Sequence, residues 1–375
     1  MNSPLRVGIV GAGNISGQYS ASFAKLPQLQ VQAVCDLDPA RAQALADAHG
    51  ARVSSLEDLL AAADVDAVLN LTLPSMHADV ARAAIGSGKH VYGEKPLAMT
   101  VADGREVVKA AAAAGVRAGC APDTVLGTGV QTARKLLEDG RIGLAHSATA
   151  FMTTPGHERW HPSPDFYYQP GGGPLLDMGP YYVSSLVHLL GPVRRVVGAS
   201  ARPQDRRTIG SGPRAGEQFP VTIDTHITGI LEHENGALST LIMSFDTWAA
   251  QLPRIEVYGT EGTLSVPDPN MFSGPVQLYS AETAPAPGAE GPDENWVDVG
   301  ELAGFVNSGR GYGLADLALS LAEGRAHRAS DELALHVLDI MESVQAAADA
   351  RSSVELTTSC ARPALVDGLQ DLAAH

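Results

Sequence analysis

Short β-rich runs alternate with helical patterns through the first third of the chain, and this alternation limits the fold more than any other feature. The pattern predicts strands at Leu5–Val10, Val31–Cys35, Ala67–Leu71, His90–Tyr92 and Val116–Gly119, with helices from about Ile15, Pro39, Met76 and Val101. Strands that alternate with helices of about 10–15 residues form a parallel sheet with helices on both faces, joined by right-handed crossovers. We therefore expect an α/β domain of the Rossmann type over residues 1–122.

A glycine turn follows the first predicted strand directly. Gly11 and Gly13 stand where a dinucleotide-binding turn has its first two glycines, and Ser16 takes the place of the third. Gly11 allows the tight turn and Gly13 lets the backbone approach a pyrophosphate, while the helix that begins around Asn14 and Ile15 offers free N–H groups. The pattern favours a dinucleotide site. The alternative is a glycine-rich turn in an α/β fold that holds no cofactor.

Asp36 closes the second predicted strand, about 20 residues after Ser16, where a carboxylate binds the adenosine ribose of a dinucleotide. A carboxylate at this place repels a 2′-phosphate, and the first arginine after it is Arg41. The sequence therefore predicts NAD as the cofactor rather than NADP. The alternative role for Asp36 is to cap the helix that opens at Pro39.

Two more segments lie at the carboxyl ends of predicted strands, where this fold binds its ligands. In the first, Thr72 and Pro74 are expected at the cofactor, and His77 either lines the cofactor or caps and packs the helix that follows. The second contains Glu94 and Lys95 before a proline, which biases the lysine backbone toward an extended conformation. We expect both at the cofactor, with Lys95 placed to move a proton while hydride moves. An exposed surface lysine is the alternative.

Residues 123–375 predict a second, α+β domain built on a large, mainly antiparallel open sheet. Its strands are expected at His146–Met152, Val193–Arg202, Ile223–Glu232, Ala237–Phe245, Arg254–Gly259 and Gly262–Val266. Turn residues at 234–236 and 260–262 indicate two hairpins, and loops are expected at 203–220 and 267–295. Helices are predicted over about 125–139 and 310–323. The last helix, over about 330–351, is expected to pack back on the first domain.

Asp177 and Tyr181 lie four residues apart and so share one face of a helix predicted to start near Asp177. The glycines at 171–173 allow close backbone approach beside it. A phenol has an ordinary pKa of about 10, and a neighbouring ammonium group of Lys95 would favour the phenolate. Lys95, Tyr181 and Asp177 are therefore the candidate catalytic residues, with Lys95 and Tyr181 as the acid/base pair. The alternative for Tyr181 is a half-buried aromatic residue whose hydroxyl binds a backbone carbonyl.

The residues before the triple glycine suit a sugar or polyol. Trp160 and His161 are candidates for substrate binding, and a packed loop is the alternative. Asp123 follows the last predicted strand of the first domain and is a candidate either for substrate hydroxyls or for the cap of the next helix. We expect His188 in the core. Arg310 is expected in a structural salt bridge rather than at the substrate.

The charge of the chain excludes some partner classes. The formal net charge is -16 and the isoelectric point about 5.1, which argues against nucleic acid or an anionic membrane, because both need clustered Lys and Arg. No apolar run approaches the roughly 18–20 residues of a membrane helix. The chain start shows no secretion signal, so we expect a cytoplasmic location. Cys35, Cys120 and Cys360 are odd in number and far apart, which predicts reduced thiols and no metal site.

Four motifs together resemble the Gfo/Idh/MocA oxidoreductases, which are named for glucose–fructose oxidoreductase, inositol dehydrogenase and the MocA protein. The motifs are the glycine turn, Thr72–His77, Glu94–Pro96 and Gly171–Tyr181, and the match covers nearly the whole chain. The resemblance implies a two-domain NAD(P)-dependent enzyme. It also implies that the inner face of the second-domain sheet covers the cofactor and that the outer face often builds a dimer or tetramer. We therefore expect a homodimer or homotetramer.

The chain departs from the family motif at one catalytic position. The motif has an aspartate followed four positions later by a histidine; Asp177 matches, but Tyr181 stands at the histidine position. In this it looks more like the glucose–fructose oxidoreductase and dihydrodiol dehydrogenase branches. Ser184 stands at a later carboxylate position. Both departures argue against inositol as the substrate.

These observations lead to one expected function and two alternatives. The expected enzyme is an NAD-dependent oxidoreductase that transfers hydride between nicotinamide and a secondary alcohol or ketone of a sugar, polyol or related ring compound. Lys95, assisted by Tyr181, takes the hydroxyl proton, and Asp177 orients the substrate and keeps Lys95 poised. One alternative is a dinucleotide-binding regulator without turnover. The other is an enzyme that recycles tightly held NAD, with net isomerisation, elimination or glycoside cleavage.

Overall fold

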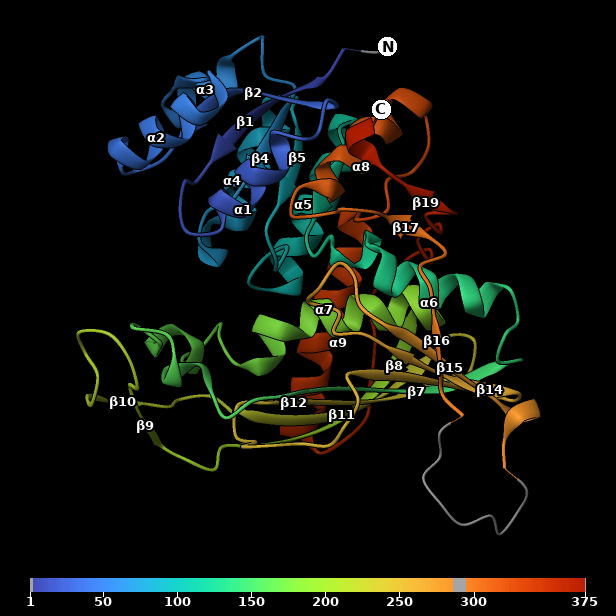
Figure 1. Ribbon diagram of the computed structural model, residues 1–375. Helices are drawn as coiled ribbons and strands as arrows, with labels where there is room; N and C mark the ends of the chain where they lie inside the picture. Colours follow the sequence, from blue (N-terminus) through green and yellow to red (C-terminus); the bar gives the residue numbers. More distant parts are fainter. Residues whose placement is uncertain (1–2, 286–294, 375) are drawn as a thin grey trace. The chain divides into compact units, whose positions relative to one another are not determined.

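A computed structural model describes residues 3–285 and 295–374, which form two compact units (Figure 1). The first unit contains the chain up to Gly127, then Gly304–Leu338, and the residues from Gly368 onward. The second unit contains Thr128–Ala303 and Asp339–Asp367. The first unit thus extends to residue 127 and takes in two later segments, whereas the predicted first domain covers residues 1–122.

The first unit is built on a six-stranded parallel sheet. Its strands are β1 (Leu5–Val10), β2 (Leu29–Cys35), β3 (Arg52–Val53), β4 (Ala67–Asn70), β5 (His90–Gly93) and β6 (Ala118–Cys120). Their order is β3-β2-β1-β4-β5-β6, and each neighbouring pair is parallel. The direction of winding reverses between β1 and β4, where a doubly wound sheet opens a crevice at the carboxyl ends of its strands. This confirms the predicted Rossmann fold.

Helices flank the first sheet. They are α1 (Ser16–Phe23), α2 (Pro39–His49), α3 (Leu56–Ala61), α4 (His77–Gly86), α5 (Val101–Ala114) and α8 (Tyr312–Glu323). Helix α5 begins at Val101 as predicted, where the Thr100 side chain accepts a hydrogen bond from the Asp103 N–H, and Gly115, with φ of 67°, ends it. Strand β3 and helix α3 are too short for a periodic pattern and are missing from the sequence prediction.

The second unit is built on a nine-stranded sheet in the order β16-β15-β14-β13-β7-β12-β11-β8-β18. Its strands are β7 (Ala145–Thr153), β8 (Val193–Ala201), β11 (His226–His233), β12 (Leu238–Ser244), β13 (Ile255–Gly259), β14 (Gly262–Val266), β15 (Val276–Ser280), β16 (Val297–Val299) and β18 (Val354–Glu355). Among these described strands, β7 and β12 are the one parallel pair. The sheet is therefore mainly antiparallel, as predicted.

Helices α6 (Thr128–Glu138) and α7 (Pro174–Leu190) pack on the second unit's sheet. The last helix, α9 (Asp331–Ala350), begins in the first unit and continues in the second from Asp339. Helix α7 lies over β7, β12 and β11 (Figure 1). Glycine lets α9 come close to β8, because a Cβ at Gly198 would lie 2.1 Å from the Val344 carbonyl oxygen. The opposite sheet face leaves apolar side chains exposed, including Val197 and Ile230.

Some elements differ from the prediction. The expected loop at 203–220 contains β9 (Arg206–Thr208) and β10 (Gln218–Pro220), which pair with each other. The expected loop at 267–295 contains β15 and a 3-10 helix, Ala281–Thr283, while residues 286–294 lie outside the described residues. Proline and glycine near these short strands hide their alternation. The helix predicted from Val125 is a 3-10 turn followed by α6.

Two further differences concern the ends of elements. Helix α7 begins at Pro174 rather than near Asp177, because a proline fits the first turn of a helix. A short pair, β17 (Gly304–Phe305) and β19 (Leu369–Gln370), belongs to the first unit and is absent from the prediction. The two predicted hairpins are confirmed, since β11 pairs with β12 and β13 with β14.

Candidate active site

The glycine turn after β1 has a shape that requires glycine at its start. Gly11 has φ of 101°, and a Cβ there would lie 2.6 Å from a backbone carbonyl oxygen of the loop after β4. A Cβ at Gly13 would meet nothing within 4 Å, so the protein itself leaves this side open. Asn14 is exposed, and Ile15 is the N-cap of α1, which begins at Ser16 without a side-chain cap. The turn therefore leaves space and helix N–H donors for an anion.

The carboxylate of Asp36, at the end of β2, holds this turn in place. Its Oδ2 accepts a 2.6 Å hydrogen bond from the Ala12 N–H, and its Oδ1 accepts one of 2.8 Å from the Asp38 N–H. The cap of α2 is Asp38, whose side chain accepts hydrogen bonds from Ala40 and Arg41. The alternative in which Asp36 caps this helix is therefore wrong. The Arg41 guanidinium lies 3.3 Å from the Asp38 carboxylate.

Apolar side chains are exposed around the carboxyl ends of these strands. Leu37, directly after β2, is 103 % exposed, and Leu73, after β4, is 73 % exposed. Met76 in the same loop is 45 % exposed. These side chains lie at the carboxyl ends of the strands, where a doubly wound sheet binds its ligands.

Polar side chains of the loop after β4 bind one another. The Thr72 hydroxyl donates a 2.7 Å hydrogen bond to Asn70 Oδ1, and Pro74 opens a 3-10 helix that leads into α4. His77 is 2 % exposed, with Nδ1 2.6 Å from the Pro96 carbonyl oxygen and Nε2 3.0 Å from the Thr72 carbonyl oxygen. Both ring nitrogens thus face the main chain. This favours packing over cofactor contact for His77, and it ties the loop after β4 to the loop after β5.

Hydrogen bonds hold the main chain on both sides of half-buried Lys95. Glu94 is buried; its Oε1 accepts a 2.8 Å hydrogen bond from the Tyr19 hydroxyl of α1, and its Oε2 accepts one of 3.1 Å from the Lys95 N–H. The Lys95–Pro96 peptide bond is cis, and His77 binds the Pro96 carbonyl. Burial and the Glu94 carboxylate raise the pKa of Tyr19, so its hydroxyl remains a donor. A fixed loop therefore presents Lys95 at the carboxyl end of β5.

The Asp123 side chain binds main-chain groups elsewhere in the first unit. It is 0 % exposed, and its Oδ2 accepts hydrogen bonds of 2.8 Å from the Gly311 N–H and 3.1 Å from the Gly313 N–H. The Arg310 guanidinium lies 3.6 Å from its other oxygen. Burial raises the pKa of Asp123, although Arg310 and the two N–H groups oppose this. Asp123 thus caps α8 rather than the helix that follows it. The substrate role predicted for it does not fit this burial, whereas Arg310 forms the expected salt bridge.

In the second unit, Asp177 lies in the first turn of α7 and contacts a histidine that the sequence analysis missed. His157 Nε2 lies 3.0 Å from Asp177 Oδ2, and the two side chains are 12 % and 18 % exposed. His157 opens a 3-10 helix, His157–Arg159, 20 residues before Asp177. No periodic pattern links the two residues. The available signal was the closeness of His157 to the aromatic segment at Trp160.

Tyr181 follows Asp177 by one turn on α7, as predicted. Its side chain is 5 % exposed, and its carbonyl oxygen accepts a 2.8 Å hydrogen bond from the Ser185 hydroxyl. His188, further along the same helix, is 0 % exposed. This agrees with the expectation that His188 lies in the core.

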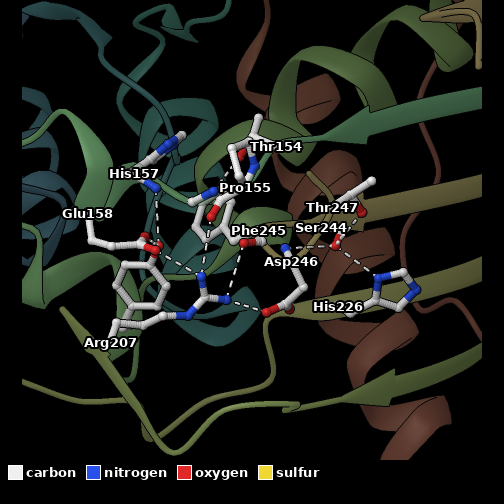
Figure 2. A network of polar contacts seen from close by, with 12 residues as sticks. Thr154, Pro155, His157, Glu158, Arg207, His226, Ser244, Phe245, Asp246 and Thr247 are labelled. Carbon is white, nitrogen blue, oxygen red and sulfur yellow. Dashed lines mark hydrogen bonds and ion pairs between the residues drawn. The ribbon is translucent and has the colours of Figure 1, made fainter. Parts of the chain in front are cut away.

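A buried ionic network supports the segment that carries His157 (Figure 2). Arg207 of β9 is paired with Glu158, at 2.8 Å, and with Asp246. It also donates to the carbonyl oxygens of Pro155 and Phe245. The Tyr168 hydroxyl donates to the Glu158 carboxylate and accepts a 3.1 Å hydrogen bond from the His157 N–H. The network therefore fixes the main chain at His157.

Aromatic rings surround the same histidine. The ring centroid of His157 lies 4.4 Å from that of Phe245, 4.7 Å from that of Tyr167 and 5.2 Å from that of Trp160. Trp160 is 58 % exposed, and His161 Nδ1 accepts a hydrogen bond from the Ser163 N–H. The structure thus brings the Trp160 ring and the His161 main chain to His157, since the His161 N–H donates a 2.9 Å hydrogen bond to the His157 carbonyl oxygen.

Metal sites, disulfide bonds and membrane-spanning helices can each be checked in the described residues. Within 3–285 and 295–374, no group of three or more His, Cys, Asp or Glu side chains is arranged to hold a metal ion. Among the described residues, Cys35, Cys120 and Cys360 form no disulfide bond. No helix in this part of the chain combines the length and the apolar character needed to cross a bilayer.

Two protein-family models match the chain. A model described as "Oxidoreductase family, NAD-binding Rossmann fold" matches residues 5–121. A model described as "GFO/IDH/MocA C-terminal domain" matches residues 130–265. The two matches meet near the boundary between the two units.

Named relatives match over most of the chain. A dTDP-3,4-didehydro-2,6-dideoxy-α-D-glucose 3-reductase of Streptomyces antibioticus is 29 % identical over 361 residues, which is 94 % of this chain and 99 % of the relative. A D-xylose 1-dehydrogenase (NADP(+)) of Haloferax volcanii is 31 % identical over 68 % of this chain and 74 % of the relative. The structure of levoglucosan dehydrogenase with NADH and L-sorbose matches with a TM-score of 0.79 and 20 % identity, over 95 % of this chain and 100 % of that one. This last likeness shows the fold.

Proposed function

Because the chain belongs to the Gfo/Idh/MocA oxidoreductase family, we propose that it is an NAD-dependent dehydrogenase for a secondary alcohol of a sugar, polyol or related ring compound. Membership makes it an NAD(P)-dependent oxidoreductase that acts on CH–OH or keto groups of sugars. The observation that carries the finer proposal is the fixed loop that presents Lys95 at the carboxyl end of β5.

The residues of the first unit fit NAD. The open side of Gly13 and the start of α1 suit the pyrophosphate, and the Asp36 carboxylate suits a ribose diol. The Haloferax relative carries NADP(+) in its name, so relatives differ in cofactor. Here Asp36 and Asp38 carry two carboxylates just after β2, and Arg41 is already paired with Asp38. These charges favour NAD over NADP.

When bound, NAD supplies the hydride acceptor at nicotinamide C4. Lys95 Nζ takes the proton of the substrate hydroxyl, with the Tyr181 phenol as its acid/base partner, and returns it in the reverse reaction. The hydrogen bonds on both sides of Lys95 fix its main chain. The lysine loop therefore loses less conformational freedom during the reaction. Asp177 accepts a hydrogen bond from a substrate hydroxyl and orients the ring.

Oxidation of a sugar panel tests this function. The protein is incubated with NAD and sugars, polyols and sugar acids, including D-xylose, levoglucosan and myo-inositol, while NADH formation is followed. Lys95→Ala should lower turnover roughly 10²–10⁴-fold with NAD affinity retained. The matched control is Lys109→Ala on α5, since that side chain is 79 % exposed.

The outcomes separate the three functions. Retained turnover in Lys95→Ala would overturn the role of this lysine. A regulator would bind NAD without oxidising any compound of the panel. An NAD-recycling enzyme would convert substrate without releasing NADH.

We also propose that two or four copies of the chain assemble through the outer face of the second unit's sheet. Val197, Ile230 and Leu238 are 39 %, 46 % and 48 % exposed on strands β8, β11 and β12. Val197 and Ile230 are direct partners in the pairing of β11 with β8, so their side chains adjoin. Light scattering should give a dimer or tetramer, and Ile230→Glu should shift it toward the monomer. A wild-type monomer would contradict the assembly.

The expected cytoplasmic location stays a prediction.

A further inference from the structure

Asp177 receives a hydrogen bond from a side chain outside its own helix. His157 Nε2 lies 3.0 Å from Asp177 Oδ2. An ionised carboxylate can only accept, so the imidazole is the donor and carries its proton on Nε2. Both side chains are mostly buried, and this shields the hydrogen bond from competing water. The contact therefore fixes the direction in which the carboxylate points.

The remaining nitrogen of His157 supports the same assignment. Nδ1 is buried and has no hydrogen-bond partner in the described part of the chain. No carbonyl or carboxylate is thus present to hold a proton at Nδ1, whereas Asp177 holds one at Nε2. A ring that carries a proton on Nε2 satisfies the observed contacts. Such a donor orients the carboxylate.

The position of the His157 ring is fixed from three sides. Phe245 and Tyr167 pack against it at centroid distances of 4.4 Å and 4.7 Å. Its main-chain N–H donates to the Tyr168 hydroxyl, which in turn binds Glu158 of the Arg207 network. Figure 2 shows His157 beside this network. A ring held in this way loses little further freedom when it binds a partner.

An arginine pairs with the carboxylates of Glu158 and Asp246, whereas a histidine binds that of Asp177. The guanidinium of Arg207 pairs with both of these buried carboxylates and so offsets their charge. Asp177 has a hydrogen bond from an imidazole, and a carboxylate can accept further hydrogen bonds beside it. Hydroxyl groups of a sugar are donors that such a carboxylate binds well.

We propose that His157 is a positioning residue that holds the Asp177 carboxylate in the orientation in which it accepts a substrate hydroxyl. This rests on the proposed function, in which Asp177 orients the sugar. The role of His157 is to act through Asp177, so the effect of its loss must depend on the presence of that carboxylate.

Three variants test this dependence. His157→Phe keeps the ring volume but removes the donor. His157→Gln places an amide N–H at a similar reach and should restore the contact. Asp177→Ala removes the acceptor. The control is His146→Gln, an exposed histidine at the start of β7.

Kinetics with the panel sugar that the wild type oxidises fastest gives the first readout. His157→Phe should raise KM roughly tenfold, which corresponds to the loss of one hydrogen bond to a charged group, and should change kcat less. His157→Gln should stay within about threefold of the wild-type KM, and His146→Gln should equal it. In the Asp177→Ala background, His157→Phe should add no further effect. An unchanged KM in His157→Phe, or an equal effect in that background, would overturn the proposal.

Thermal unfolding gives a second readout that needs no activity. If the pair exists, the Tm losses of His157→Phe and Asp177→Ala are not additive in the double variant. Additive losses would overturn the pairing. If no sugar of the panel is oxidised but the losses are non-additive, the proposed substrate class fails while the pair stands. Affinity for NAD should be the same in all of these variants.

Discussion

The Tyr19 hydroxyl donates a 2.8 Å hydrogen bond to Glu94 Oε1, and this links helix α1 to the residue directly before Lys95. Tyr19 is 0 % exposed and Glu94 is 8 % exposed, so water does not easily replace the bond. The other oxygen of the same carboxylate accepts from the Lys95 N–H. A side chain of the helix that follows the glycine turn therefore helps to fix the loop of the proposed catalytic lysine.

Tyr19→Phe should lower both stability and turnover. The variant leaves a buried carboxylate oxygen without this donor, which costs about 1–3 kcal/mol. Loosening of the Lys95 loop should lower kcat by roughly tenfold, while KM for NAD changes less. Steady-state kinetics and thermal unfolding measure the two effects.

The matched control for this variant is Tyr92→Phe. Tyr92 on β5 is also 0 % exposed, but its hydroxyl has no hydrogen-bond partner among the described residues. Removing that hydroxyl should leave the Tm unchanged or raise it, because a buried polar group without a partner is costly. Equal Tm losses in both variants would contradict the importance of the Tyr19–Glu94 bond.

Asp36→Asn should change the choice of cofactor. The amide keeps an oxygen for the Ala12 N–H but loses the acceptor for the Asp38 N–H and the negative charge that repels a 2′-phosphate. The ratio of the Kd values for NADP and NAD should fall at least about tenfold, which is 1.4 kcal/mol. Titration with both cofactors measures the ratio. Asp47→Asn, on the exposed side of α2, should leave it unchanged. The same ratio in wild type and Asp36→Asn would argue against the ribose role.

Asp331, in the first turn of α9, should make stability depend on pH. Burial raises its pKa to about 6 from an ordinary 3.8. The folded state then binds the proton more tightly than the unfolded state, so stability falls as pH rises from about 4 to about 6. Asp331→Asn stays neutral and escapes this loss. It should have a higher Tm than the wild type at pH 8 and a similar Tm at pH 4. A Tm difference that is equal at both pH values would contradict the shift.

Arg207→Met should destabilise the second unit strongly. The guanidinium is 5 % exposed and pairs with two buried carboxylates, so its loss leaves them uncompensated at about 3–5 kcal/mol. Adding Glu158→Gln and Asp246→Asn should restore part of the loss. Arg214→Met is the control, because Arg214 pairs with Asp165 and Glu217 at 38 % exposure and should move Tm little. Chemical denaturation measures the series, and similar losses at both arginines would refute the prediction.

Local signals in the sequence predicted the first unit well. Helix α5 begins at the predicted Val101, because Thr100 before it is a favoured N-cap residue. The glycine turn and Asp36 were predicted at the cofactor from their spacing, and the structure shows Asp36 bound to the turn at Ala12. Spacing of this kind was informative because the residues lie on consecutive strands of one parallel sheet.

Contacts over long stretches of chain could not be predicted in this way. Asp123 follows a strand, as a ligand-binding residue does, yet it caps a helix 188 residues later. His157 and Asp177 lie on different elements with no shared period. Arg207 lies in a segment whose prolines and glycines indicated a loop. In each case the partner is set by tertiary packing, which a local pattern does not contain.

The division of the first unit into three stretches of chain has a consequence for synthesis. Asp123 follows the last strand of the sheet that is translated first, and the N–H groups that bind its carboxylate belong to Gly311 and Gly313. The outer strand β6 is also completed only by Ser330, which forms an isolated antiparallel β-bridge with Gly119. Before these residues are synthesised, the Asp123 carboxylate lacks its N–H partners and the edge of the sheet at β6 is open. We therefore expect the part that is translated first to be among the last to reach its native state.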